Sequence, residues 1–197
     1  VTQDLLIPSD IVLTIQEGVE LRMLDESNLI VEGKLIINGT EENPVQITGH
    51  NSIVNNRWGS ICFNNASDTS YIFHTKISGA SVGINPLVHH GAISSINSHV
   101  VISHLEIEDV LFPVYVENGS LSINASLISC DYICDYINVK GGDALIENCT
   151  FYGSNTEDTD AIDLDNVING MVRNNRIYNF LGSNSDGIDI GESSEDI

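Results

Sequence analysis

The stretch Ile146-Glu147-Asn148-Cys149-Thr150-Phe151 places one apolar residue at each end of four polar or small residues. The same phrase occurs at four other places in the chain: Ile72–Ile77, Ile102–Ile107, Ile123–Ile128 and Val172–Ile177. The starts of successive phrases are 30, 21, 23 and 26 residues apart. A self-similar period of this length is typical of a solenoid, in which one repeat cannot bury its apolar face alone and neighbouring repeats stack around a shared core. We therefore predict a repeat architecture.

The segments between the phrases have the two-residue period of β-strands and lack the 3.6-residue period of helices. Apolar and polar residues alternate in four of them: Val114–Val116, Ile137–Val139, Ile162–Leu164 and Ile188–Ile190. Clusters rich in Gly, Asn, Ser and Asp separate the strands and favour turns and left-handed backbone. The clearest clusters are Glu117–Ser120, Gly141–Asp143 and Gly182–Ser185. The predicted fold is an all-β parallel β-helix whose short strands are joined by tight polar turns.

The repeat resembles that of right-handed parallel β-helix proteins of the pectate-lyase-like superfamily, most clearly in Ile146–Phe151 and Val172–Ile177. That superfamily often stacks asparagine side chains at a turn, and the resemblance places Asn148 and Asn174 there. Four upstream segments resemble the opening coils of bacterial surface β-helix modules: Gly33–Leu35, Asn38–Thr40, Glu42–Val45 and Trp58–Ile61. The resemblance covers nearly the whole chain. It implies a right-handed solenoid of secreted or cell-surface type, and it identifies architecture far better than activity.

Length and composition favour one continuous domain. The chain has 197 residues, of which 42% are hydrophobic and only 6% aromatic, which suits a core of stacked Ile, Val and Leu. We expect residues 1–56 to form an N-terminal cap with the first strands of the solenoid, and residues 57–197 to form its coils. An insertion near residues 85–91 is expected to form a loop on one face. At the C-terminal end, the last strand is expected to contact further coils or another chain, since a bare edge would otherwise be exposed.

The charge limits the classes of partner. With 28 acidic and 7 basic residues, the formal net charge is -21, and no basic stripe offsets it. Such a chain repels phosphate backbones, so nucleic acid is not expected as a partner. No run of 18 or more apolar residues occurs, so no membrane insertion is expected. The acidic, Asn-rich and Lys-poor composition favours an extracellular or cell-surface location.

The strongest candidate site is a pair of acidic stretches, 160–165 and 186–192, that lie one coil apart. Asp163 and Asp189 are 26 residues apart and flanked by apolar residues, so alternation points both outward on adjacent coils. The same register predicts two outward files. One file is Tyr115, Asn138, Asp163 and Asp189, and its neighbour is Glu117, Lys140, Asp165 and Gly191. Carboxylates, amides and an aromatic ring on one flat surface suit a polysaccharide, so we assign substrate binding to these residues other than Gly191.

Calcium is the cofactor that this surface suggests. Two stacked carboxylates disfavour each other, so one is expected to have a raised pKa unless a cation or Lys140 compensates. Calcium accepts several carboxylate ligands in flexible geometry, and we name Asp163, Asp165 and Asp189 as its candidate ligands. The alternative is a solvated acidic face without a ligand, in which the aspartates end strands and make turns.

A catalytic function is the alternative to a binding or structural one. Residues 184–189 resemble the Asn-Thr-Asp-Gly-x-Asp stretch of polygalacturonase-type hydrolases, and the resemblance assigns catalysis to Asp186, with Asp189 as a second candidate. The further acidic pair and the histidine of that family are not present after this stretch. A polysaccharide lyase would need a base such as Lys140, although acidic neighbours at Glu117 and Asp165 keep an amine protonated.

The cysteines and histidines have simpler interpretations. Cys130 and Cys149 read as small core or turn residues, and a Cys130–Cys134 bridge is the alternative. His74 and His104 occupy the same repeat position and are expected to stack. His89 and His90 are expected to be solvated in the inserted loop, with metal ligation as the alternative. Trp58 is expected to pack in the core.

Overall fold

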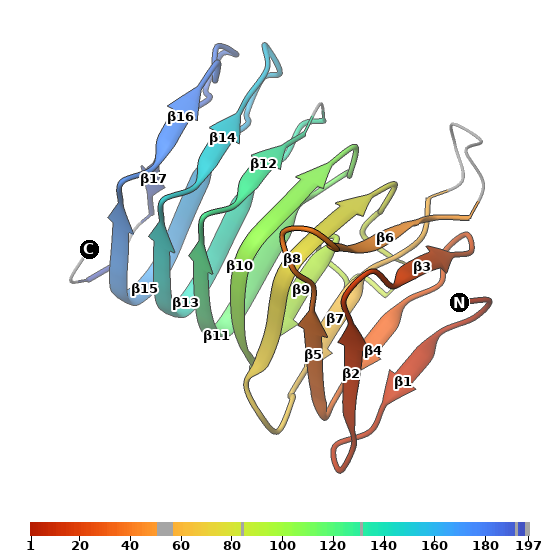
Figure 1. The fold of residues 1–197 in the computed structure, drawn as a ribbon. Coiled ribbons are helices and arrows are strands. Elements are labelled where there is room, and N and C mark those ends of the chain that lie inside the picture. Colours follow the sequence, from red (N-terminus) through yellow and green to blue (C-terminus); the bar gives the residue numbers. More distant parts are fainter. Residues whose placement is uncertain (51–56, 84, 131, 192, 196–197) are drawn as a thin grey trace.

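The chain folds into a parallel β-solenoid of about seven turns (Figure 1). The computed structural model describes residues 1–50, 57–83, 85–130, 132–191 and 193–195. These residues contain 17 strands, all paired in parallel, and no helix. None of the described segments could therefore cross a bilayer as an apolar helix. The predicted all-β solenoid is confirmed, whereas its right-handedness stays a prediction.

Each coil contributes strands to three parallel stacks. The first stack contains β1 (Leu5–Ile7), β4 (Leu29–Val31), β7 (Ile61–Asn64), β9 (Ile93–Ile96), the first halves of β11 (Val114–Asn124), β13 (Ile137–Glu147) and β15 (Ile162–Arg173), and β17 (Asp189–Ile190). The second contains β2 (Val12–Gln16), β5 (Lys34–Asn38), the first halves of β8 (Ser70–Ser78) and β10 (His99–Glu108), and the second halves of β11, β13 and β15. The third contains β3 (Glu20–Met23), β6 (Val45–Gly49), the second halves of β8 and β10, β12 (Leu127–Ser129), β14 (Thr150–Tyr152) and β16 (Arg176–Tyr178).

The recurring phrase marks the corner between the second and third stacks. One residue per phrase has a positive φ of 43° to 58°, and these residues are His74, His104, Ala125, Asn148 and Asn174. A single left-handed residue turns the chain, so the apolar residues on either side both point into the core. In the phrase 146–151, the two ends are fully buried. The separation of the two apolar residues in each phrase is therefore the separation across one bend of the chain.

Asparagines bond between coils at this corner in a different pattern from the expected one. Asn148 Nδ2 donates to Asn124 Oδ1 at 2.8 Å. One coil later, Asn175 makes the contacts: its Oδ1 accepts from the Cys149 backbone N–H and its Nδ2 donates to the Ile146 carbonyl, both at 2.8 Å. Asn148 is thus linked to the preceding coil, and Asn175 supplies the side chain that bonds to the coil of Asn148.

Two of the simpler expectations are confirmed. The rings of His74 and His104 are stacked, with centroids 4.3 Å apart and planes 16° from parallel. Trp58 is fully buried, and its indole N–H donates to the Ser78 carbonyl at 2.8 Å. Stacking of like residues at one repeat position is what vertical register produces in a solenoid.

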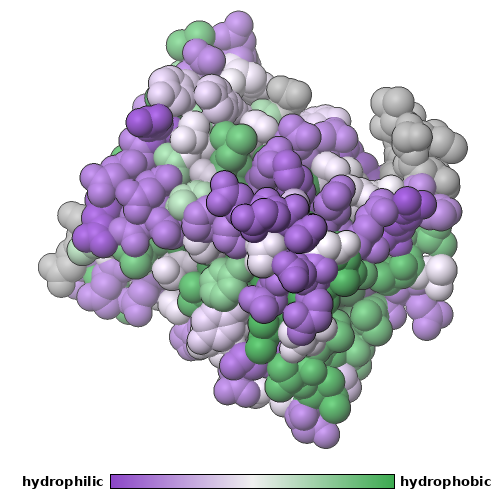
Figure 2. All heavy atoms as spheres, in the orientation of Figure 1, coloured by the Kyte–Doolittle hydropathy of each residue, from purple (hydrophilic) through white to green (hydrophobic). Residues whose placement is uncertain are grey.

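The two ends of the solenoid differ from its middle. Strands β1 to β6 already lie in the same three stacks, while a boundary at residue 56 lies outside the described residues, and a capping role for residues 1–56 stays a prediction. Apolar surface gathers over β1 and β2 (Figure 2), where Leu5, Leu6, Ile11 and Val12 are exposed. At the other end, Ile188 and Ile190 are 43% and 52% exposed. Contact of this end with further coils or another chain stays a prediction.

All four cysteines are buried thiols, and the Cys134 thiol donates to Cys130 Sγ at 3.2 Å. Burial raises the pKa of Cys62 to about 12 and also raises that of Cys149, while the Cys134 pKa is raised by its bond to Cys130 and by burial. Because the thiolate is the reactive form, we expect a thiol-specific reagent to label the native protein slowly and to label four thiols after unfolding without reductant. Fewer than four labelled thiols would instead support the Cys130–Cys134 bridge.

Candidate functional site

The outward face of the first stack has the predicted register. Tyr115 pairs with Asn138, Asn138 with Asp163, and Asp163 with Asp189 on successive coils. In the neighbouring file, Glu117 pairs with Lys140 and Lys140 with Asp165, and Gly191 follows through its N–H bond to the Leu164 carbonyl. Adjacent rungs are about 4.8 Å apart, so these side chains form continuous files along the solenoid axis.

A second acidic file, which sequence reasoning missed, precedes these strands. Asp160 N–H donates to Asp135 Oδ1 at 3.3 Å, and Asp186 N–H donates to Asp160 Oδ1 at 2.5 Å. Each aspartate stands two residues before an Ile, in Asp-x-Ile triplets 25 and 26 residues apart. That repeated triplet is the signal that could have found the file.

Aspartates from both files line a cavity of about 380 Å³, which we call the acidic cavity. It is lined by Phe112, Ile133, Cys134, Asp135, Asp158, Asp160, Asp163, Asn184 and Asp189. Burial raises the pKa of Asp163 to about 7, with further contributions from Asp165, Asp135 and Asp189. Burial likewise raises the pKa of Asp160. The predicted raised carboxylate pKa is thus present at Asp163, and its main cause is burial, with repulsion by Asp189 secondary.

A second cavity of about 460 Å³, the aromatic cavity, adjoins the first because Phe112 and Asp135 line both. Its lining residues are Val82, Gly83, Pro86, His89, His90, Phe112, Tyr115, Asp135, Asn138 and Lys140. The His90 ring packs on Tyr115 with centroids 4.4 Å apart, and Phe112 meets Tyr115 edge-on at 6.4 Å. The cavity therefore offers aromatic surface beside a few polar groups.

The inserted loop supplies one wall of the aromatic cavity. His89 is only 7% exposed, its Nδ1 accepts from the Asn85 N–H at 3.2 Å, and burial lowers its pKa. His90 is half-buried, and its N–H donates to Ser94 Oγ at 3.2 Å. The expectation that both histidines are solvated at a loop tip is wrong for His89, because the loop folds back onto the sheet instead of extending from it.

Asn138 lies where the two cavities meet and is 5% exposed. Its Nδ2 donates to Asp135 Oδ2 at 3.0 Å and to Asp163 Oδ2 at 2.5 Å. Two carboxylates fix the orientation of the amide, because a rotated amide would aim its oxygen at them. Its Oδ1 is the buried side-chain atom without a hydrogen-bond partner among the described residues. Leaving such an acceptor unpaired costs about 1–3 kcal/mol, so the position calls for a donor.

The remaining predicted site residues have direct partners. Tyr115 Oη donates to Glu117 Oε2 at 2.9 Å, and burial raises the Tyr115 pKa. Lys140 Nζ lies 3.9 Å from Asp165 Oδ2. Asp186 lines neither of the two cavities, although its backbone N–H bonds to Asp160.

The calcium assignment stays a prediction. Asp163 and Asp189 are paired across adjacent strands, and Asp165 lies two residues from Asp163 on the same face. Within the described parts of the chain, no group of three or more His, Cys, Asp or Glu side chains is already arranged to hold a metal ion.

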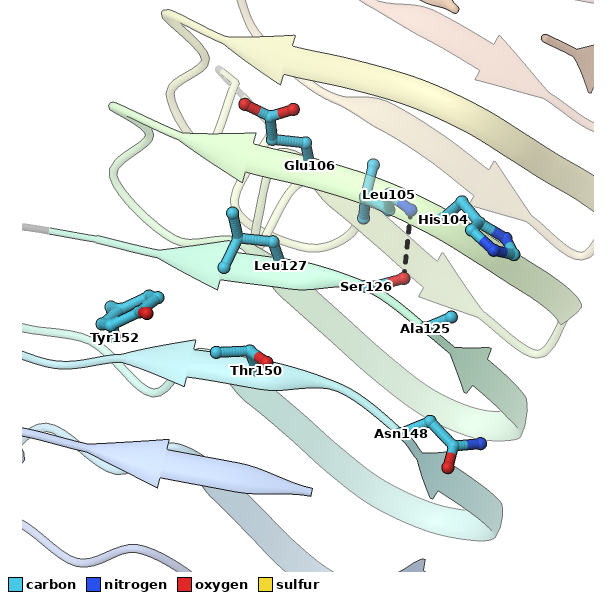
Figure 3. A pocket seen from close by; sticks show the side chains of 9 residues that line it. All are labelled: His104, Leu105, Glu106, Ala125, Ser126, Leu127, Asn148, Thr150 and Tyr152. Carbon is cyan, nitrogen blue, oxygen red and sulfur yellow. Dashed lines mark hydrogen bonds between the residues drawn. The ribbon is translucent and has the colours of Figure 1, made fainter. Parts of the chain in front are cut away.

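Another concavity, of about 500 Å³, lies outside the corner between the second and third stacks (Figure 3). It is lined by His104, Leu105, Glu106, Ala125, Ser126, Leu127, Asn148, Thr150 and Tyr152. Ser126 Oγ accepts from the Leu105 N–H at 3.1 Å, and Tyr152 stacks on Tyr178 with centroids 5.4 Å apart. It has an exposed aromatic surface but no buried polar atom that lacks a partner among the described residues, so it is the weaker candidate.

Comparison of the chain with protein-family models, curated proteins and solved structures gives no significant match. The function is therefore inferred from the geometry of the site.

The raised pKa of Asp163 predicts how stability depends on pH. The unfolded chain binds fewer protons than the folded one between the ordinary carboxyl pKa of 3.8 and the folded value of about 7. The stabilising contribution of protonated Asp163 is therefore complete below pH 3.8 and is lost as pH rises through about 7. Because the group is partly exposed, we expect an effect on the order of 1–2 kcal/mol.

Asp163→Asn is expected to raise the melting temperature at pH 8 and to leave it nearly unchanged at pH 4. The matched control is Asp68→Asn, which removes the same charge from an exposed loop position. Thermal melts from pH 4 to 8 measure the difference. Equal pH profiles for the two variants would show that general charge repulsion, not Asp163, sets the slope.

Proposed function

We propose that the protein is a secreted or cell-surface β-solenoid that binds a glycan along the outward face of its first stack. The observation that carries the proposal is the buried Asn138 Oδ1, which lacks a donor beside the aromatic cavity. Sugars offer hydroxyl donors next to apolar ring faces, and this cavity is lined by the rings of Tyr115 and His90 together with Asn138, whose buried Oδ1 is unpaired among the described residues.

The length of the surface supports a chain of sugars over a single one. Tyr115 and Asp189 are separated by three rungs, which is about 14 Å along the axis. Rigid strands carry every residue of this file, so the groups that would contact the glycan are preorganised. The likeness of the repeat to the pectate-lyase-like superfamily supports the same class of ligand, and the acidic, Lys-poor composition supports an extracellular setting.

Glycan binding is tested with an oligosaccharide panel and two variants, Tyr115→Ala and Asn138→Leu. Each is expected to weaken binding about tenfold or more, since each removes an interaction of about 1.4 kcal/mol. Tyr152→Ala is the matched control, because it removes an exposed tyrosine from the third stack. Circular dichroism verifies that each variant is folded. Binding that is absent across the panel, or equally weak in the control, would contradict the proposal.

Calcium is the cation that we propose for the outward aspartates Asp163, Asp165 and Asp189. Burial is the main cause of the raised Asp163 pKa, and a divalent cation would offset both that burial and the repulsion from Asp165 and Asp189. Melting curves with calcium and with EDTA are expected to differ in the protein and not in Asp163→Asn. An identical melting temperature in both solutions would remove calcium from the proposal.

A carbohydrate-active enzyme is the second candidate, favoured by the Asp163 pKa of about 7 among other carboxylates. A general acid works best with a pKa near the working pH, so Asp163 suits that role better than Asp186, which lies outside the cavities. Asp189 lines the same cavity as Asp163, whereas Lys140 lies beside Asp165. Release of reducing ends without unsaturated uronate absorbance would indicate a polygalacturonase-like hydrolase, whereas reducing ends together with that absorbance would indicate a polysaccharide lyase.

A further inference from the structure

The acidic cavity has a strongly one-sided lining. Five aspartates line it, namely Asp135, Asp158, Asp160, Asp163 and Asp189, and no Lys, Arg or His is among its described lining residues. A bound cation would offset the mutual repulsion of these like charges.

The net charge opposes an acidic polysaccharide as the ligand. With a formal charge of -21, the protein repels an acidic polysaccharide at a distance, and the aspartates repel it at contact. The nearest cation of the face, Lys140, is already beside Asp165. Calcium at Asp163 and Asp189 with a neutral glycan would still leave Asp135, Asp158 and Asp160 without a cationic partner.

The unpaired amide connects the acidic cavity to a ligand. Asn138 donates to two of the five aspartates, Asp135 and Asp163; it also lines the aromatic cavity, and its buried Oδ1 is unpaired among the described residues. One ligand that spans both cavities would need a hydroxyl donor and an apolar ring face at one end, and a cationic donor at the other. Phe112 and Asp135 line both cavities, so the two cavities adjoin at these residues.

We propose that the glycan carries free amino groups, with a sugar ring against Tyr115 in the aromatic cavity and an ammonium group among the aspartates of the acidic cavity. This inference rests on the proposed glycan binding and names its ligand class. An ammonium group has three donors and no acceptor, which matches a site made of carboxylate oxygens. Ring hydroxyls are donors for the unpaired Asn138 Oδ1, and because a basic peptide also supplies donors, oligolysine is the probe that separates it from an amino-sugar chain.

Titration calorimetry with oligomers of equal length tests the proposal, at a pH where glucosamine amines are protonated. The probes are glucosamine oligomers, N-acetylglucosamine oligomers, galacturonate oligomers and oligolysine. We expect the glucosamine oligomer to bind at least about tenfold more tightly than its N-acetylated counterpart, and to weaken as salt is raised.

The double variant Asp158→Asn/Asp160→Asn, at two lining residues of the acidic cavity outside the glycan-binding file, is expected to abolish this preference while it retains the weaker binding of the N-acetylated oligomer. Its matched control, Asp10→Asn/Asp68→Asn, removes two charges at exposed positions and is expected to keep the preference. Because asparagine at position 160 keeps the oxygen that accepts from the Asp186 N–H, the double variant is expected to fold.

The other outcomes separate this inference from the proposed function. Equal binding of the acetylated and free-amine oligomers, or tighter binding of galacturonate, would overturn the amino-sugar assignment and leave glycan binding intact. Oligolysine that competes as well as the glucosamine oligomer would overturn it in favour of unspecific charge attraction. Binding of none of the probes would overturn both the assignment and the glycan-binding function.

Discussion

Replacing Ile123 with aspartate is expected to prevent the protein from folding, whereas the same change at Ser122 is expected to leave it folded. Ile123 is fully buried in β11, and the register places it between Ile102 and Ile146 of the neighbouring coils, which are also buried. A carboxylate there has no partner, so the cost is on the order of 4 kcal/mol or more. That is most of the stability of a domain at the lower end of the typical range of about 5–15 kcal/mol.

Ser122 is the matched control, since it lies on the same strand and alternation points it outward. Circular dichroism and urea unfolding of the two variants measure the difference. We expect Ile123→Asp to lack the strand signal and the cooperative transition, and Ser122→Asp to change the free energy of unfolding by less than about 1 kcal/mol. A folded Ile123→Asp protein would contradict the inward direction of this residue and with it the stacked core.

Of the two Gly→Ala changes at the turn that follows Lys140, Gly142→Ala is expected to be the more destabilising. Gly142 has a φ of +83°, and an added Cβ would lie 1.9 Å from the Gly119 carbonyl oxygen of the preceding coil. The left-handed backbone costs a non-glycine residue about 1–2 kcal/mol, and the clash with rigid backbone adds about 1–3 kcal/mol. The clash would also displace the turn that follows Lys140, and so disturb the aromatic cavity.

The neighbouring Gly141 provides the control. Its φ is +75°, but an added Cβ would meet the movable Asn118 side chain at 3.0 Å, not backbone. Gly141→Ala is therefore expected to cost only the left-handed penalty of about 1–2 kcal/mol. Urea unfolding of both variants tests whether contact between coils sets the cost. Equal destabilisation would show that backbone conformation alone matters at this turn.

Several features of the fold and site could be predicted because a solenoid repeats its environment at a fixed sequence interval. Alternation in Ile162–Leu164 gives the inward and outward directions, and the distance of 26 residues to Ile188 gives the partner strand. Those two facts place Asp163 beside Asp189 without knowledge of any other contact. The same logic predicted the stack of His74 on His104.

Other features of the site depend on where a loop or a side chain lies within one coil, which has no period. The return of the inserted loop buries His89 and brings His90 onto Tyr115, and no spacing in the sequence indicates that contact. The acidic file of Asp135, Asp160 and Asp186 is also periodic, but it stands before the strands, where alternation gives no direction, and of the three only Asp186 was a predicted site residue.

The sequence by itself determined the parallel solenoid, the inward residues of its strands and the vertical order of Tyr115, Asn138, Asp163 and Asp189. These follow from local alternation and coil length, which are written in the order of the residues. Only the tertiary structure decided that Asn138 is buried with its amide held by two carboxylates and its oxygen unpaired. Burial, hydrogen bonding and the pKa of Asp163 depend on the distances between side chains from different coils and from the inserted loop, and those distances exist only once the chain has folded.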